Sequence, residues 1–340
     1  MKHRALLTGS LALLLCGAGA PAGDYRSDAP DVARTTKAFA GGKDEFRFAV
    51  IGDRTGQHRA GVFEDALRKV NQLRPDFVIN IGDLIEGNSE DLSQIDAEWK
   101  EVEDATADLD MPFFYVPGNH DLTNDVQLKE WRRRFGADYY SFIYKNALFL
   151  VLNTEDPPQP QIARSKLFRE YGAEVMAKAL KALQGDPEEA KALFTRDARV
   201  GELAAKLKAS ENVAFSARQV AMVRDALARH RNVRWTFLLM HRPAWKVESP
   251  AFREIEGMLR GRDYSVLAGH FHRYEHQLRE GHDYVQLGVT GGMPGGQAGD
   301  PAVLDHIMWV SVAKAAPTIT NIRLDGFFPK EGPSRPTAQP

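Results

Sequence analysis

Five strand-like runs in this chain each end on a residue of a type that binds metal ions. The runs are short and apolar, and patterns with helical spacing separate them, which is typical of an open α/β sheet. Ligands of such sheets bind outside the carboxyl ends of the strands. We therefore expect one shared site for the residues that follow the runs, which are Asp53, Asp83, Asn119, His241 and His270.

The rest of the pattern continues the α/β alternation. The five runs span residues 46–51, 77–81, 112–116, 235–240 and 264–268. Helices are predicted over residues 62–70, 92–109, 216–230 and 250–260, and a hairpin over residues 140–144 and 148–152. Shorter strands are predicted over residues 284–287, 306–312 and 319–324.

Each polar residue alone would say little, because a Gly-Asp pair after a strand is more often a turn and a lone histidine is more often structural. Their joint occurrence, closed by Gly269-His270-Phe271-His272, is much harder to explain by chance. The ligand types are carboxylate, amide and imidazole without thiolate, which suits Mn, Fe or Zn and does not choose among them.

The ordered motifs resemble those of the calcineurin-like metallophosphoesterase superfamily over about residues 46–290. They are Gly52-Asp53, Gly82-Asp83, Gly118-Asn119-His120-Asp121, His241 and Gly269-His270-Phe271-His272. The resemblance implies an α/β fold (α+β in some schemes), built as a four-layer α/β/β/α sandwich, to which the chain's own composition adds a helical insertion. It also implies a centre of two divalent or trivalent metal ions at one end of the sandwich.

The resemblance further implies a role for each motif. Asp83 would bridge the two ions. One ion would also be bound by Asn119, His241 and His270, and the other by Asp53 and His272. His120 would lie over the substrate phosphate, which Asn119 would also contact, and Asp121 would hold and orient His120.

This arrangement predicts a hydrolase of phosphomonoesters or phosphodiesters. A metal pair lowers the pKa of a bound water, so that a metal-bridging hydroxide can attack phosphorus in line, and it clamps the attacking and leaving oxygens. General acid help from His120 would contribute roughly 10²–10⁴-fold. The alternative is a non-catalytic metal- or phosphate-binding protein that has lost full dinuclear activity.

One position departs from the commonest family pattern, which has a histidine two residues after the first aspartate. Thr55 stands there, so the ion of Asp53 and His272 lacks a strong ligand. We hypothesise that Glu86, three residues after Asp83, approaches this ion directly or through water. A surface or helix-capping Glu86 is the alternative, and His58 is a third option.

Two arginines stand beside predicted ligands. Arg54 follows Asp53 and Arg242 follows His241, so each could contact the substrate phosphate. The alternative for each is an ordinary salt bridge.

The phosphoesterase domain is predicted to span residues 45–328. Residues 157–213, rich in Ala, Lys, Glu and Leu, are interpreted as a helical insertion that is either a solvated excursion or a lid over the substrate pocket. Residues 23–44 are predicted to be a flexible N-terminal arm and residues 329–340 a disordered tail.

The N-terminus has the pattern of a cleaved signal peptide over residues 1–22. A basic start precedes an apolar run, residues 5–16, which is too short to span a bilayer comfortably, and Ala20-Pro21-Ala22 offers a cleavage site. A lipoprotein interpretation through Cys16 is weaker. Export, periplasmic or secreted, is therefore expected, with no membrane span after cleavage.

The formal net charge is -2, so nucleic acid is not an expected partner, and a small phosphate ester is the expected substrate. The sequence does not predict the oligomeric state.

Overall fold

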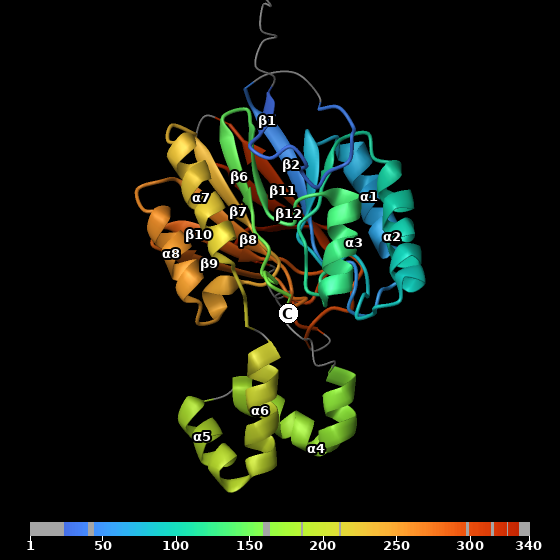
Figure 1. The fold of residues 1–340 in the computed structure, drawn as a ribbon, viewed down its shortest axis with the longest axis vertical. Helices are drawn as coiled ribbons and strands as arrows, with labels where there is room; N and C mark the ends of the chain where they lie inside the picture. Colours follow the sequence, from blue (N-terminus) through green and yellow to red (C-terminus); the bar gives the residue numbers. More distant parts are fainter. Residues whose placement is uncertain are drawn as a thin grey trace, which may run out of the picture.

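Two mixed β-sheets pack face to face, with helices on both outer sides (Figure 1). The computed structural model describes residues 24–39, 44–158, 164–184, 186–210, 212–296, 299–313, 316–324 and 326–332. The arrangement confirms the α/β sandwich that the motifs imply. None of the helices in these ranges is long and apolar enough to cross a membrane.

The six-stranded sheet carries the first three motifs. Its order is β13-β12-β11-β2-β3-β4, in which β2, β3 and β4 are parallel and β11 is antiparallel to β2. The strands are β2 (Phe46–Ile51), β3 (Phe77–Asn80), β4 (Phe113–Phe114), β11 (His306–Val312), β12 (Thr318–Arg323) and β13 (Gly326–Pro329).

The seven-stranded sheet carries the last two motifs. Its order is β1-β5-β6-β7-β8-β10-β9, and β6, β7, β8 and β10 are parallel. The strands are β1 (Tyr25–Ser27), β5 (Tyr140–Tyr144), β6 (Ala147–Val151), β7 (Trp235–Leu239), β8 (Tyr264–Ala268), β9 (Glu275–Arg279) and β10 (His282–Gln286). The β5–β6 turn has positive φ at Lys145 and Asn146, as a two-residue hairpin requires.

Helices cover the outer face of each sheet (Figure 1). On the six-stranded side lie α1 (Val62–Leu73), α2 (Leu92–Ala107) and α3 (Asp125–Phe135); on the seven-stranded side lie α7 (Ala217–Arg229) and α8 (Pro250–Met258), with the short 3-10 helix Ala244–Lys246 before α8. The N-terminal N–H groups of four helices are satisfied by the side chains of Asp91, Asn124, Ser216 and Ser249.

Aromatic side chains dominate the space between the sheets. The Phe77 ring centroid lies 5.3 Å from that of Phe48 and 5.4 Å from that of Phe149, so residues of both sheets interlock. A second apolar cluster lies between the seven-stranded sheet and helices α7 and α8. Packing from both sides fixes the carboxyl ends of the parallel strands, where the predicted ligands are attached.

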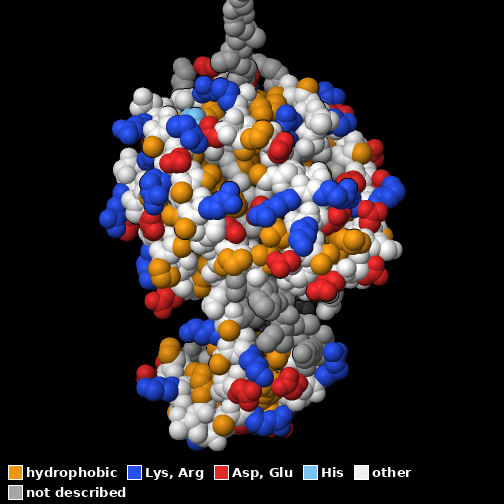
Figure 2. Space-filling view, in the orientation of Figure 1, with side chains coloured by type: hydrophobic (Ala, Val, Ile, Leu, Met, Phe, Trp, Pro, Cys, Tyr) orange, Lys and Arg blue, Asp and Glu red, His pale blue; other side chains and the backbone are white. Residues whose placement is uncertain are grey.

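Three helices occupy the predicted insertion: α4 (Arg164–Gln184), α5 (Pro187–Arg196) and α6 (Ala198–Ser210). They enclose a small apolar core of their own and lie beyond the end of the sandwich where β6 ends (Figure 1). Helix α4 is broken at Gly172, which has a φ of 82°. Acidic and basic side chains are interspersed over the visible face of both parts (Figure 2).

The insertion leaves the sandwich through a hydrogen-bonded stem. Glu155 and Ala214 form an isolated parallel bridge, and the Ala214 N–H donates to the carbonyl of Thr154 at 2.8 Å. Ser216 donates to the Asp156 carboxylate at 2.5 Å. Because β6, β7 and β8 are parallel, this stem emerges at the same edge of the sheet as His241 and His270.

The N-terminal segment differs from the predicted flexible arm. Strand β1 pairs with β5, and the N–H groups of Thr35 and Tyr115 donate to the carbonyls of Phe113 and Ala33 respectively, both at 2.9 Å. The ring of Phe39 stacks on those of Tyr25 and Tyr144, each at 4.8 Å. The prediction is wrong for residues 24–39, because this segment covers an edge strand of each sheet.

The chain end is also more ordered than predicted up to residue 332. Lys330 Nζ lies 3.0 Å from the Asp283 carboxylate. The main-chain carbonyl of Lys330 accepts a hydrogen bond from the Tyr274 hydroxyl. Residues 333–340 of the predicted tail, and the predicted signal peptide over residues 1–22, lie outside the described residues.

Candidate metal centre

Two groups of potential metal ligands converge at one edge of the sandwich and share Asp83. The first contains Asp83, His241 and His270, and the second contains Asp53, Asp83 and His272. Within each group the ligand atoms lie within 4.8 Å of one another. Asn119 joins the first group, since its Oδ1 is 3.1 Å from His241 Nε2. The structure thus brings together all the predicted metal-binding residues except Glu86.

The strands place these side chains in the interior. Asp53 and Asp83 follow β2 and β3 of one sheet, and His241 and His270 follow β7 and β8 of the other. Asp53 and His241 are fully buried, and Asp83 is only 1% exposed. Buried carboxylates are costly unless positive charge or hydrogen bonds compensate them.

Three of the ligands have an unusual main-chain conformation. Asp83, His270 and His272 have φ values of 56°, 79° and 56°, in the left-handed region. Such a conformation costs about 1–3 kcal/mol for a non-glycine residue and clusters at functional sites. The loops are therefore held in shape by their surroundings and not by local preference.

The glycines before the ligands allow this close packing. A Cβ atom on Gly118 would lie 2.1 Å from Asp83 Oδ1, and one on Gly269 would lie 2.5 Å from Asp53 Oδ1. The recurring Gly-ligand pairs of the sequence thus make room for a carboxylate from another strand.

Main-chain carbonyls orient two of the imidazoles. Nδ1 of His241 is 3.0 Å from the carbonyl of Ile81, and Nδ1 of His272 is 2.6 Å from that of Met293. A carbonyl can only accept, so each Nδ1 carries the proton and each Nε2 presents a lone pair in the neutral ring. Both Nε2 atoms face carboxylates, His241 toward Asp83 at 3.1 Å and His272 toward Asp53 at 3.3 Å.

In both groups, therefore, the lone pair of a histidine nitrogen faces the lone pairs of a carboxylate oxygen. These atoms repel each other unless a cation or a bound proton lies between them. Without a metal ion, burial lowers the pKa of His241, but the Asp83 carboxylate outweighs burial and raises it to about 9. Burial likewise opposes ionisation of Asp83, yet His241 and His120 hold its pKa well below the usual range. Burial also lowers the pKa of His272, but Asp53 raises it overall.

The predicted role of Asp121 is wrong. Its carboxylate is directed at main-chain groups and not at the His120 ring, and it accepts four N–H hydrogen bonds of 2.8 to 3.2 Å, from Gly118, Asp83, Leu84 and Ile85. Burial and the nearby Asp83 carboxylate raise the pKa of Asp121 to about 6. Asp121 therefore shapes the loop that carries Asp83.

His120 is held by a main-chain group instead. Its Nδ1 lies 2.7 Å from the carbonyl of Glu86, so the neutral ring donates there and presents Nε2. The main-chain N–H of His120 donates to Asp83 Oδ1 at 2.9 Å. The side chain of Asn88 lies against the same ring edge, with Nδ2 3.3 Å from Nδ1.

The two candidates for an additional ligand near Asp53, Glu86 and His58, do not join the second group. Glu86 Oε1 accepts from the main-chain N–H of His58 at 2.8 Å, and neither residue belongs to a ligand group. Thr55 is fully buried, and its hydroxyl donates to the carbonyl of Asp83 at 3.3 Å. The hypothesis that Glu86 is a direct ligand is therefore not supported by its position.

The two arginines are buried and paired with acids. Arg54 is 3% exposed and donates to the carbonyl of Leu84 and to Glu101, both at 3.0 Å, so it forms the salt bridge that was the alternative to a phosphate contact. Arg242 donates to Glu155 at 2.6 Å, and its Nη1 lies 3.2 Å from Nε2 of His270. Arg242 and Glu155 therefore form a polar wall behind the His270 ring.

Sequence reasoning missed Glu155 and the carbonyls of Ile81, Met293 and Glu86. A signal for Glu155 existed, because Asn153-Thr154-Glu155 follows a strand as the other polar motifs do. Carbonyl groups occur at every residue, so no sequence pattern could single out the three that orient histidines.

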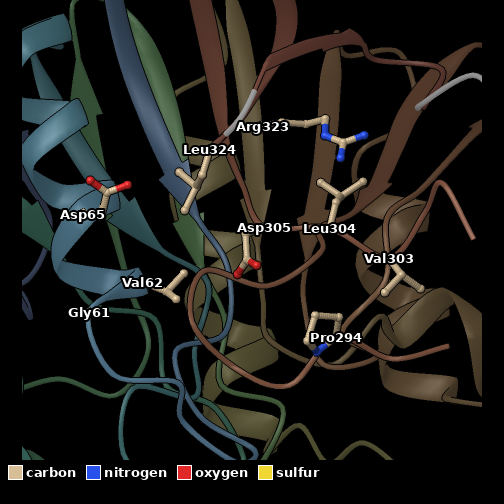
Figure 3. Close-up of a pocket in the computed structure, with 9 residues that line it drawn as sticks. All are labelled: Gly61, Val62, Asp65, Pro294, Val303, Leu304, Asp305, Arg323 and Leu324. Carbon is tan, nitrogen blue, oxygen red and sulfur yellow. The ribbon is translucent and has the colours of Figure 1, made fainter. Parts of the chain in front are cut away.

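A separate pocket lies between the start of α1 and the segments around Asp305 and Arg323 (Figure 3). Its acids are already paired, Asp65 with Lys69 and Asp305 with Arg59, both at 2.5 Å. None of the predicted ligands lines it. Within the described ranges, the two groups around Asp83 are the metal-ligand groups found.

The geometry agrees with the comparison to known families. The family model described as calcineurin-like phosphoesterase matches residues 46–274, most of the sandwich. This chain belongs to the calcineurin-like phosphoesterase family. The matched range contains every residue of the two ligand groups.

The relatives found among characterised proteins match only a limited part of this phosphoesterase and of their own length. The chain is 33% identical over 106 residues to serine/threonine-protein phosphatase CPPED1 of Bos taurus, covering 27% of this chain and 31% of that protein. For the Rattus norvegicus protein the identity is 34% over 115 residues, covering 31% and 35%. The alignment thus spans about a third of these relatives.

Solved structures resemble this phosphoesterase over most of its length. A dimetal phosphatase from Danio rerio has a TM-score of 0.50 at 13% identity, covering 85% of this chain and 99% of that one. The structure of PhoD has a TM-score of 0.51 at 10% identity, covering 87% and 73%. At these identities the likeness shows the fold alone.

Replacing Gly118 by alanine should abolish metal binding by this phosphoesterase, because the new Cβ would displace the Asp83 carboxylate. Gly257→Ala in α8 is the matched control, since its new Cβ would meet no heavy atom of another segment within 4 Å, and it should slightly stabilise the helix. Metal content by mass spectrometry, with thermal unfolding of both variants, checks this. Full metal content in the folded Gly118→Ala protein would contradict the packing argument.

Proposed function

We propose that this protein is a metal-dependent hydrolase of phosphate esters. The observation that carries the proposal is the pair of ligand groups that share the buried carboxylate of Asp83. Lone pairs of imidazole, amide and carboxylate groups converge there, which fits two cations better than a metal-free site. The first ion would be held by Asp83, Asn119, His241 and His270, and the second by Asp53, Asp83 and His272.

Bound ions of this kind activate a water at neutral pH and neutralise charge on the transferring phosphoryl group. The protein's own residues orient the groups that would bind the ions. Main-chain carbonyls of Ile81 and Met293 hold the lone pairs of His241 and His272 toward the centre. Asp121 fixes the loop that carries Asp83, and the buried Arg242–Glu155 pair lies against the His270 ring.

His120 is placed to handle a proton. The carbonyl of Glu86 binds Nδ1–H, so Nε2 is the atom that gains or loses a proton. In the imidazolium form, Nε2–H would donate to a phosphoryl or leaving-group oxygen, and the Glu86 carbonyl would stabilise the charged ring. This role requires no carboxylate partner for His120.

The proposed substrate is a small phosphomonoester or phosphodiester. The relatives are called serine/threonine-protein phosphatases, so a phosphopeptide belongs in the same test. The insertion leaves the sandwich beside His270 through the Glu155–Ala214 stem. It is therefore the best-placed segment to limit the size of the ester that reaches the centre.

Three substitutions test the assigned roles on p-nitrophenyl phosphate and bis-p-nitrophenyl phosphate with added Mn²⁺. Asp83→Asn should lose metal and nearly all turnover. His120→Ala should keep its metal but lose about 10²–10⁴-fold in kcat. Asp121→Ala should lose metal, because the Asp83 loop loses four hydrogen bonds.

Wild-type protein that binds metal but turns over neither ester, nor a phosphoserine peptide, would favour a non-catalytic binding protein. Normal metal content in Asp121→Ala would contradict its loop-shaping role. A His120→Ala variant with full kcat would remove His120 from the reaction.

Replacing residues 158–212 by a short Gly-Ser linker should leave metal content unchanged, because the described part of the insertion has its own core and supplies no ligand to either group. We expect the ratio of kcat/KM between a bulky phosphodiester and p-nitrophenyl phosphate to rise by at least about tenfold. The linker joins the two sides of the existing stem. An unchanged ratio across the substrate panel would rule out a lid function.

A further inference from the structure

We propose that this phosphoesterase forms a two-fold symmetric dimer through strand β9, which pairs antiparallel with β9 of a second copy of the chain. Strand β9 (Glu275–Arg279) lies at one edge of the seven-stranded sheet, and β10 is its neighbour there among the described strands. The dimer would join the two seven-stranded sheets into one continuous sheet. The proposal concerns a sheet edge, so it stands independently of metal binding and hydrolysis.

The outward main-chain groups of β9 are available for pairing. A two-residue turn, Glu280–Gly281 with positive φ at both positions, joins β9 to β10, so Arg279 and His282 form the hydrogen-bonded pair that closes the hairpin. The hydrogen-bonding direction alternates along an antiparallel strand, so the N–H and C=O groups of His276 and Leu278 point away from β10. Among the described residues, these outward groups have no main-chain partner.

This edge lacks two of the features that usually prevent pairing with another chain, which are a proline and a bulge. Strand β9 contains no proline, and its five residues pair with β10 in an uninterrupted register. Leu278 is 65% exposed, the largest fraction among the big apolar side chains of the described ranges. The N–H of Tyr274 donates to the carbonyl of Ala302, so the free edge begins at His276.

The sequence of β9 is complementary to itself in one antiparallel register. Centring the pair on Gln277 places His276 of each copy opposite Leu278 of the other, and each of these two pairs exchanges two hydrogen bonds. The same register places Glu275 of one copy opposite Arg279 of the other, with their side chains close together. A shift by two residues in either direction leaves one hydrogen-bonded pair within the strands and loses this charge match.

The charged residues at the two ends of β9 can each accept a second partner. Lys246 Nζ donates to Glu275 at 2.7 Å, and Arg279 donates to Glu256 at 3.1 Å. The side chains of Glu275 and Arg279 nevertheless stay 46% and 35% exposed. In the dimer, Lys246 and Glu275 of one copy would be followed by Arg279 and Glu256 of the other. Each end of the interface would therefore carry a row of alternating charges.

The experiment is sedimentation velocity of the full chain at increasing protein concentration. A typical stable interface buries about 1,200–2,000 Å², and one short strand pair buries less, so we expect a reversible dimer that depends on concentration. Leu278→Lys should weaken association about tenfold or more, because a lysine on the paired edge loses its hydration. Leu92→Lys is the matched control at another exposed leucine, 57% exposed, and should associate like the wild type.

Glu275→Lys and Arg279→Glu test the register. Either variant alone places like charges opposite each other at both ends of the interface, and should stay monomeric where the wild type is dimeric. An equimolar mixture of the two variants should form dimers, because opposite charges then face each other at both ends. Circular dichroism checks the folding of each variant. If a charge variant does not fold, Leu278→Lys and its control still decide the question.

A wild type that stays monomeric at every soluble concentration would overturn the inference, and so would a dimer that Leu278→Lys leaves intact. Folded charge variants that do not dimerise when mixed would contradict the proposed pairing. Residues 333–340 follow the last described residue, so a chain that lacks them is measured in parallel. Dimers that appear only after this deletion would mean that the chain's own end occupies the edge, which would also contradict the proposal.

Discussion

The buried carboxylate of Asp83 is the group on which the rest of the centre depends. It belongs to both ligand groups, and one of its oxygens also accepts the N–H of His120. Its main chain has a positive φ, and it needs the bare backbone of Gly118 beside it. A carboxylate so enclosed is stable only with positive charge close by, and two shared cations would supply that charge.

The surrounding fold holds this unfavourable arrangement in place. Asp121 gathers the N–H groups of Gly118, Asp83, Leu84 and Ile85, and thereby ties the loop after β3 to the loop after β4. The aromatic core between the sheets then fixes the strands that carry these loops. The N-terminal segment pairs with β4 and β5 and keeps both sheets covered along one side. Segments that contain no predicted metal ligand therefore also help to hold the site in shape.

Much of this could be predicted from the sequence. Apolar runs followed by Asp53, Asp83, Asn119, His241 and His270 located the strands and the shared edge, because parallel strands end together. The partners of individual side chains could not be predicted. Asp121 is adjacent to His120, but the turn directs its carboxylate to the main chain of the Asp83 loop. Arg54 is adjacent to Asp53, but its guanidinium lies against Leu84 and Glu101. Adjacent residues in a loop point in different directions, and only the folded main chain decides which.

The most direct test of the shared carboxylate is a crystal structure of the protein soaked with Mn²⁺, with anomalous diffraction data collected near the Mn absorption edge. The account predicts two anomalous peaks, both in contact with Asp83, one next to His241 and His270 and the other next to Asp53 and His272. Peaks that do not touch Asp83, or a single peak at saturating Mn²⁺, would contradict it.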